Sequence, residues 1–274
     1  MKKLYGVTVA MITPFTEEGN VDVKALEKLT EMLISRGVNC LYPCGTTGEM
    51  VHLSEEERKT VAETVIRAAS GRANVFIHCG AMTQQETEKL VKHAYEAAAD
   101  GVGVVTPMFL GVTDKEMAAY YEKISSLVPP EFPIYLYNIP QCSGNDLKKT
   151  TAEQITENCE NVIGIKYSYP DMMRTLEYLE IPNFSVLHGC DKMFAELLLM
   201  GCDGTVSGVA GVFPEPFVAV YEAWKHKDIP AMQKWQKVCI KFCNLLRCGA
   251  NMSWFKQALA LRGLPVGGMR APQQ

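Results

Sequence analysis

Eight short apolar segments, each followed by a longer stretch, constrain the fold more than any other feature of the sequence. The segments are rich in Val and Ile, and they are continuous rather than alternating. Such runs are typical of strands buried on both faces of a parallel sheet. The predicted strands are Gly6–Ile12, Val38–Tyr42, Asn74–His78, Gly101–Val105, Pro133–Tyr137, Val162–Lys166, Phe184–Leu187 and Gly204–Val206.

The stretches between these segments have the spacing of helices. Leu26, Leu29 and Leu33 fall on one stripe of the first stretch, as the core-facing side of a helix requires. Ser54 followed by Glu57 has the form of a capping box at the start of the second. The predicted helices are Val21–Arg36, Ser54–Ala69, Thr83–Ala99, Asp114–Leu127, Thr151–Cys159, Met172–Leu179 and Lys192–Met200.

Eight such units predict an α/β fold, a (β/α)8 TIM barrel over residues 1–212. An open doubly wound sheet is the alternative, but the glycine-rich nucleotide loop typical of it is missing from the sequence. Three more predicted helices follow the eighth strand. We expect residues 213–274 to form a C-terminal helical appendage that packs on the barrel as one structural unit: Pro214–Lys225, Ile229–Leu246 and Met252–Arg262.

Charge and composition argue against several classes of partner. The formal net charge is -4 and no Lys/Arg-rich run occurs, so we expect no nucleic-acid binding. No apolar stretch has the length of a membrane span, and the polar start of the chain lacks the apolar core of a signal peptide. We therefore expect a cytoplasmic protein, no membrane partner and ten reduced cysteines.

A metal site is the less favoured interpretation of the cysteines. Cys239, Cys243 and Cys248 are the one group worth weighing, and the first two share a face of a predicted helix. No C-x-x-C pair occurs, and Phe242 and Leu246 nearby indicate a buried helix. We expect core packing rather than zinc binding, and no metal site.

The carboxyl ends of the strands are where a barrel of this kind carries its reactive groups. Lys166 ends the sixth predicted strand, directly after an apolar run. Burial favours the neutral amine of such a lysine, which is a nucleophile for carbonyl groups. The alternative is a lysine that extends to solvent or pairs with a carboxylate.

Other strand ends supply hydroxyl groups. Tyr137 ends the fifth predicted strand, so its phenol is expected near Lys166 and suits a proton relay; a core aromatic is the alternative. Thr46 and Thr47 lie between Gly45 and Gly48 in a turn whose backbone N–H groups suit a carboxylate. An ordinary strand-to-helix turn would have the same composition.

Two further strand ends have weaker interpretations. His78-Cys79 has the residue types of a thiol nucleophile and its base, but no third orienting group is evident. His188 and Asp191 are metal-ligand types, yet no second cluster completes a ligand set. We expect these two residues to line a pocket or cap a helix.

Three strand-end motifs together resemble the dihydrodipicolinate synthase / N-acetylneuraminate lyase family. They are Gly45-Thr46-Thr47-Gly48-Glu49, Tyr137-Asn138-Ile139-Pro140 and Gly164-Ile165-Lys166, and the resemblance extends over essentially the whole chain. It implies a pyruvate-dependent class I aldolase with no metal or organic cofactor, and commonly a homotetramer built as a dimer of dimers. It also implies that Lys166 forms the Schiff base, that Tyr137 relays protons, and that Thr46 and Thr47 bind the pyruvate carboxylate.

Departures from the family pattern bear on the aldehyde substrate. Cys142 stands where dihydrodipicolinate synthases have an arginine for the aldehyde's carboxylate, and a thiol cannot make that charged contact. Ser143-Gly144 instead follows the form of the sialic acid lyases, although Lys192 and Gly208 depart from it. The resemblance assigns substrate binding to Gly45, Ser168, Gly189, Asp191, Val206 and Ser207, in addition to the two threonines.

The sequence therefore predicts a Schiff-base lyase that reversibly cleaves a 4-hydroxy-2-oxo acid to pyruvate, or another 2-oxo acid, and an aldehyde. The substrate would be N-acetylneuraminate or a 2-keto-3-deoxy sugar acid. One alternative is a dihydrodipicolinate synthase that condenses pyruvate with aspartate semialdehyde. The other is a non-catalytic oxo-acid sensor, which Phe109 in place of a family tyrosine and the bulky Tyr169 would suit.

Overall fold

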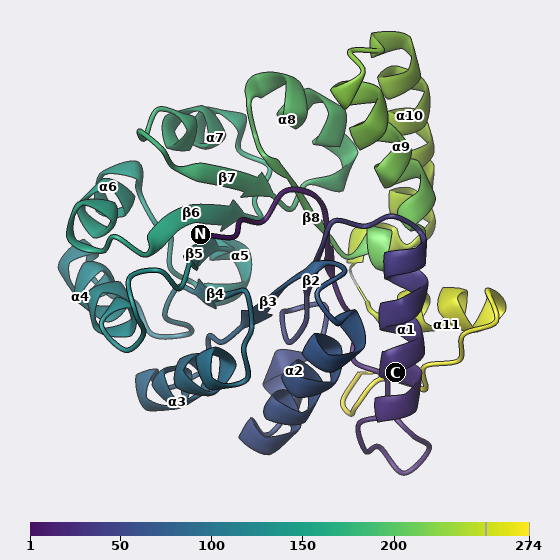
Figure 1. Ribbon diagram of the computed structural model, residues 1–274, viewed down its shortest axis with the longest axis horizontal. Helices are drawn as coiled ribbons and strands as arrows, with labels where there is room; N and C mark the ends of the chain where they lie inside the picture. The colour runs from purple at the N-terminus through teal and green to yellow at the C-terminus, as the bar shows by residue number, and fades with distance from the viewer. Residues whose placement is uncertain (250, 274) are drawn as a thin grey trace.

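The alternation of strands and helices closes into a barrel in the computed structural model, which describes residues 1–249 and 251–273. Eight parallel strands pair in chain order, and β1 (Gly6–Ala10) pairs with β8 (Gly204–Ser207) to complete the ring. Figure 1 shows the helices around this barrel. The predicted (β/α)8 TIM barrel is confirmed, and the open doubly wound sheet is excluded.

The observed strands lie within two residues of their predicted bounds at either end. Those between β1 and β8 are β2 (Cys40–Tyr42), β3 (Asn74–His78), β4 (Gly101–Val105), β5 (Ile134–Asn138), β6 (Val162–Tyr167) and β7 (Ser185–His188). Along β5 and β6, Tyr137 is the register partner of Lys166. The expectation that these two residues are neighbours is therefore confirmed.

The predicted barrel helices are also present. They are α1 (Val23–Ser35), α2 (Glu55–Ala69), α3 (Gln84–Glu96), α4 (Asp114–Ser125), α6 (Lys149–Asn158), α7 (Met172–Leu179) and α8 (Phe194–Met200). The Ser54 hydroxyl accepts a hydrogen bond from Glu57 N, and the Glu57 side chain bonds back to Ser54 N, so the predicted capping box is confirmed. Thr113 and Glu116 form a second one at α4.

Several single turns lie outside what the periodicity predicts. The predicted helix Lys192–Met200 is wrong at its start, because Asp191–Met193 form a separate 3-10 turn, η2, before α8. Elements this short carry too few residues for a periodic pattern. The others are α5 (Pro140–Ser143), η1 (Met50–His52), η3 (Val209–Gly211) and η4 (Arg247–Gly249).

The three C-terminal helices are α9 (Pro214–Lys225), α10 (Ile229–Leu245) and α11 (Ser253–Leu261). Helix α9 packs against β1, α8 and α10, and Figure 1 shows α9 and α10 side by side next to α8. The chain after α11 returns to the loop that follows β1, where Phe15 N donates a hydrogen bond to Val266 O at 3.0 Å. The C-terminal helices thus contact both the side of the barrel and one of its loops.

The core has two parts, as expected for a barrel. A large cluster fills the space between strands and helices and includes the leucine stripe of α1. A smaller cluster fills the inside of the barrel with Tyr42, Phe76, Tyr135 and Leu187 among its members. Burying each such side chain contributes about 1.5–3 kcal/mol. The filled interior leaves the carboxyl ends of the strands as the place for a site.

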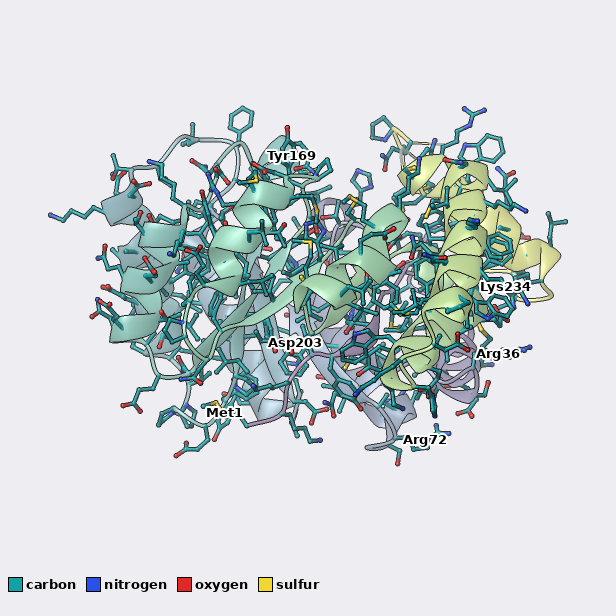
Figure 2. All side chains as sticks on the ribbon, turned by 90° about the horizontal axis from the view of Figure 1, so that it is seen from above. Met1, Arg36, Arg72, Tyr169, Asp203 and Lys234 are labelled. Atoms are coloured by element: carbon teal, nitrogen blue, oxygen red, sulfur yellow. The ribbon has the colours of Figure 1, made fainter. Side chains whose placement is uncertain are left out.

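Figure 2 shows residues from the two ends of the barrel on opposite sides of the molecule. Tyr169, which follows β6, lies on one side of the molecule, whereas Met1 and Arg72, which precede β1 and β3, lie on the other. Within residues 1–249 and 251–273, no helix combines the length and the apolar character needed to cross a membrane.

The cysteine predictions are confirmed only in part. Cys239 and Cys243 on α10 are buried in the large core cluster, as expected from core packing. Cys248 in η4 is exposed, so the prediction is wrong for that residue, because α10 ends at Leu245 and Cys248 lies in the separate turn that follows.

Candidate active site

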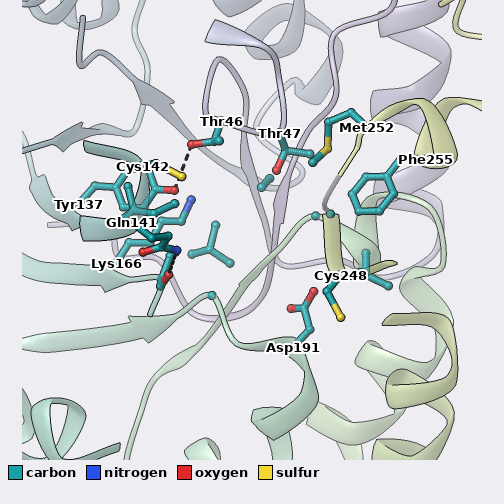
Figure 3. Close-up of a pocket in the computed structure, with 18 residues that line it drawn as sticks. Thr46, Thr47, Tyr137, Gln141, Cys142, Lys166, Asp191, Cys248, Met252 and Phe255 are labelled. Carbon is teal, nitrogen blue, oxygen red and sulfur yellow. Dashed lines mark hydrogen bonds between the residues drawn. The ribbon is translucent and has the colours of Figure 1, made fainter. Parts of the chain in front are cut away.

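A cavity of about 240 Å³ opens at the carboxyl ends of the strands. Figure 3 shows Lys166, Tyr137 and Thr46 on one side of it and Met252 and Phe255 on the other. Its volume is below the roughly 300–1,000 Å³ of sites for drug-sized ligands, as suits a small substrate. Position and size make it the candidate active site.

Lys166 lies in the wall of this cavity with its side chain 4% exposed. Its Nζ lies 3.9 Å from the ring centroid of Tyr137 and 4.7 Å from that of Tyr42. Among the described residues, the amine has no hydrogen-bond acceptor and no carboxylate partner. The two alternatives for this lysine, extension to solvent and a carboxylate pair, are therefore both wrong.

Tyr137 lies between the amine of Lys166 and the turn after β2. Its hydroxyl lies 3.3 Å from Thr46 Oγ1, within hydrogen-bonding distance. The ring is nearly fully buried and meets the rings of His78 and Tyr42 edge to face, with centroids 5.6 and 6.4 Å apart. This packing fixes the phenol between an amine and a second hydroxyl, an arrangement suited to proton transfer.

The turn after β2 presents unpaired backbone N–H groups. Gly48 N and Glu49 N donate to the carbonyls of Gly45 and Thr46, which closes the turn. The N–H groups of Gly45, Thr46 and Thr47 have no acceptor within the described part of the chain. Consecutive free N–H groups form a concave site for anions. Thr46 and Thr47 line the cavity, whereas Gly45 lies behind them and is buried.

Glycine is required at one position of the opposite wall. A Cβ on Gly189 would lie 2.3 Å from Ser168 Oγ, so any side chain there would displace the serine. Both residues line the cavity, and so does Val206 from β8. Ser168 N also donates to Asn138 O, which ties the loop after β6 to β5.

Asp191 is the one carboxylate among the described residues that line the cavity. Desolvation raises its pKa to about 7, although hydrogen bonds from Ser207 and Thr205 and the charge of Lys166 act in the opposite direction. Ser207 itself is fully buried, and its Oγ accepts a hydrogen bond from Ala210 N. Ser207 thus contacts Asp191 but does not line the cavity.

The remaining strand-end residues lie in the core. Cys79 is fully buried, and burial raises the pKa of its thiol, so the thiol-nucleophile interpretation is wrong. Burial lowers the pKa of His78 well below its usual range and that of His188 to about 4. Within the described residues, no group of His, Cys, Asp and Glu is arranged to hold a metal ion.

The C-terminal segment contributes a wall that the strand-end rule does not predict. Cys248, Gly249, Met252 and Phe255 line the cavity, and so do Gln141 and Cys142 of α5. Figure 3 shows Asp191 and Cys248 close together below Phe255. The apolar spacing of the last helix predicts that Phe255 is buried, but no sequence signal indicates that it reaches the mouth of the barrel.

Comparison with known proteins identifies relatives over nearly the whole chain. A probable 2-dehydro-3-deoxy-D-pentonate aldolase of Escherichia coli K12 is 30% identical over 97% of this chain and 90% of its own length. The N-acetylneuraminate lyase of Rattus norvegicus is 30% identical over 100% and 88%. A 4-hydroxy-tetrahydrodipicolinate synthase of Syntrophus aciditrophicus is 32% identical over 97% and 91%.

A solved structure agrees with this result. It is a prophage protein of the dihydrodipicolinic acid synthase family from E. coli K12 in complex with pyruvate, which superposes with a TM-score of 0.94. It is 28% identical, and the match covers 100% of this chain and 93% of that one. Residues 3–274 match the family described as the dihydrodipicolinate synthetase family. The chain belongs to this family of pyruvate-dependent Schiff-base lyases and aldolases.

Proposed function

We propose that the protein reversibly cleaves a 4-hydroxy-2-oxo acid into pyruvate and a short, uncharged aldehyde. The observation that carries this proposal is the amine of Lys166, which is buried at a cavity without an acceptor or carboxylate among the described residues. In the condensing direction, the amine adds to C2 of pyruvate and water leaves, which forms an imine on Lys166. In the cleavage direction, the C3–C4 bond breaks and its electron pair moves into the imine, which becomes an enamine.

Tyr137 and Thr46 are proposed to move the protons of these steps. The 3.3 Å contact between their oxygens allows a proton to pass from one hydroxyl to the other. During cleavage Tyr137 accepts the proton of the C4 hydroxyl as its own phenolic proton passes to Thr46, and the proton that Thr46 then releases is delivered to the enamine carbon. Water finally hydrolyses the imine and releases pyruvate, so the amine of Lys166 is regenerated.

The turn after β2 is proposed to bind the carboxylate of pyruvate. Thr46 and Thr47 line the cavity, and their hydroxyls and free N–H groups, with the N–H of Gly45 behind them, would supply donors to an anion. A carboxylate bound there would place C2 of pyruvate near Lys166. These residues would therefore select for a 2-oxo acid, with no cofactor required.

The charge of the cavity supports an uncharged aldehyde. Lys166 is the one basic residue among the described lining residues, and in the imine its nitrogen is bonded to the oxo acid, so it does not pair with a carboxylate of the aldehyde. The other charged group is Asp191, which would repel a second carboxylate. Ser168, Gly189, Val206 and Asp191 with Ser207 behind it would contact a hydroxylated chain. A 2-keto-3-deoxy sugar acid fits this description, and N-acetylneuraminate is the larger candidate of the same class.

The synthase reaction is the second candidate, because relatives of that name match at 32% identity. It requires a cationic partner for the carboxylate of aspartate semialdehyde, and Cys142 lines the cavity at the position expected for it. A sensor that binds an oxo acid without turnover would have the same carboxylate turn. Both alternatives are distinguishable by the test below.

An oligomer in the cytoplasm is the proposed form of the enzyme. Val51, Met82, Phe109 and Leu110 are exposed apolar side chains around the loops after β2, β3 and β4. Such a group is typical of an association surface, which supports the homotetramer that the family resemblance implies. Because the cavity takes residues from both 1–212 and 213–274, we also infer that the two parts act as one unit.

Borohydride reduction in the presence of pyruvate tests the proposal. A stable pyruvyl adduct that maps to Lys166, and that is lost in Lys166→Ala, is the expected result. Turnover is then measured with uncharged hydroxyaldehydes and with aspartate semialdehyde, in the direction of condensation. Absence of an adduct at saturating pyruvate would refute the imine mechanism. An adduct without turnover of any aldehyde would favour the sensor.

A further inference from the structure

A buried ion pair lies directly beside the turn Gly45–Gly48 after β2, called here the carboxylate turn. Lys256 Nζ and Glu49 Oε1 are 2.7 Å apart, and both side chains are 2% exposed. Glu49 follows Gly48 and has a left-handed backbone with φ of 59°. A residue with a side chain rarely adopts this conformation, so the contacts of Glu49 must hold it there.

The pair joins segments that lie far apart in the sequence. Lys256 Nζ donates to Gly268 O at 2.7 Å and lies 4.2 Å from the ring centroid of Phe15. Glu49 Oε2 accepts a hydrogen bond from Arg270 N at 3.2 Å. Helix α11, the chain after it and the loop after β1 therefore all converge on the residue that ends the turn.

The same part of α11 also reaches the cavity. Phe255, the residue before Lys256, lines the cavity. A Cβ on Gly208 would lie 3.1 Å from both Phe255 Cε2 and Thr47 Oγ1, so the phenyl ring and the threonine both lie beside this glycine. One turn of helix thus contacts Glu49 through Lys256 and, through Phe255, lies beside Gly208, which also neighbours Thr47.

Stability alone does not explain such a pair. Taking two charges out of water is unfavourable, and replacing a buried pair by apolar side chains is often neutral or stabilising. Desolvation lowers the pKa of Lys256 even though Glu49 acts in the opposite direction. The pair is better explained by its effect on the position of the turn Gly45–Gly48.

We propose that Glu49 and Lys256 are positioning residues that hold the turn Gly45–Gly48 in the geometry that binds the substrate carboxylate. This inference rests on the proposed function and deepens it, because it makes the C-terminal helix part of the pyruvate site. The pair acts through the turn and does not itself contact the substrate.

Lys256→Met is the main test variant. It leaves the Glu49 carboxylate without its cation next to the anion site, so KM for pyruvate should rise about 10- to 100-fold. At saturating pyruvate the turn is occupied, and kcat should stay within about threefold of wild type. Glu49→Gln removes the negative charge and keeps the side-chain shape, so its KM should rise less.

The double variant Glu49→Gln/Lys256→Met leaves neither charge unpaired. Its KM should be lower than that of Lys256→Met alone, a coupling that a double-mutant cycle measures. The double variant also keeps the test valid if Lys256→Met does not fold, because it lacks the unpaired buried carboxylate that would destabilise the single variant. In that case, KM of the double variant is compared with wild type and with Glu49→Gln.

Arg262→Met is the matched control. Arg262 caps the end of the same helix and bonds to Val212 O and Glu215, but it does not contact the turn. Both variants should lower Tm, and only Lys256→Met should raise KM. Equal KM in wild type and Lys256→Met, or an equal rise in the control, would overturn the positioning role. Borohydride trapping of pyruvate by the wild type is scored separately, because its failure would refute the proposed function instead.

Discussion

Replacing Tyr42 with phenylalanine should stabilise the protein, because the hydroxyl of Tyr42 is buried without a hydrogen-bonding partner among the described residues. The ring fills the inside of the barrel. Its Oη lies against Gly103, where a Cβ would stand only 2.0 Å from the oxygen. The hydroxyl is therefore closely packed on that side.

The magnitude follows from the cost of an unpaired polar group. A buried hydroxyl without a hydrogen bond costs about 1–3 kcal/mol, and removing one oxygen leaves only a small void. We expect the free energy of unfolding to rise by about 1 kcal/mol, and Tm by about 2–4 °C. Phenylalanine keeps the ring that lies 4.7 Å from Lys166 Nζ, so catalysis should be retained.

Tyr135→Phe is the matched control inside the same barrel. The Tyr135 hydroxyl donates to Ser185 Oγ at 3.0 Å and accepts from Leu4 N at 3.2 Å, so its loss should destabilise by about 1–2 kcal/mol. Urea unfolding, followed by circular dichroism at one protein concentration, compares the three proteins. If both variants lose similar stability, the Tyr42 hydroxyl has a partner and the reasoning is refuted.

Three further predictions concern the cavity. Gly189→Ala should lower kcat/KM at least about tenfold, because its Cβ would lie 2.3 Å from Ser168 Oγ; steady-state kinetics with unchanged values would contradict this. The pKa of Asp191 is raised to about 7 from 3.8. The folded wild type therefore loses stability as the pH rises through this interval, because the carboxylate ionises more readily in the unfolded chain. Asp191→Asn should accordingly be stabilised relative to wild type by more at pH 8 than at pH 5. An equal gain in urea unfolding at both values would disprove it. Cys142→Arg should favour an aldehyde that carries a carboxylate over an uncharged one. Competition between the two aldehydes measures this preference, and an unchanged product ratio would contradict the prediction.

Much of the fold could be predicted because both strand burial and helix amphipathicity leave periodic patterns. The predicted bounds of β3 and β4 agree with the structure, because polar residues mark where the apolar runs stop: His78 is the last residue of β3, and Thr106 directly follows β4. Helix α3 ends at Glu96, three residues before its predicted end. Ala97–Ala99 continue the apolar composition but not the helix, which composition alone does not reveal.

The candidate site likewise has a part that could be predicted from the sequence and a part that could not. Lys166, Tyr137 and Thr46 were accessible to prediction because barrel geometry brings strand ends together. Phe255 and Cys248 were not, because their place depends on how the C-terminal helices dock on the barrel. That docking includes the buried pair of Lys256 and Glu49, two residues more than 200 positions apart. No local pattern encodes a contact of this range.

The pairing of β1 with β8 has a consequence for how the chain is made. The ring can close only after residues 204–207 have been synthesised and have paired with residues 6–9. Until then, β1 and β7 each present an open edge to other chains during synthesis, and such edges are templates for aggregation. Slower translation downstream of β7 would lengthen this exposure. The yield of correctly folded protein should therefore depend on chaperones and temperature more than its final stability would suggest.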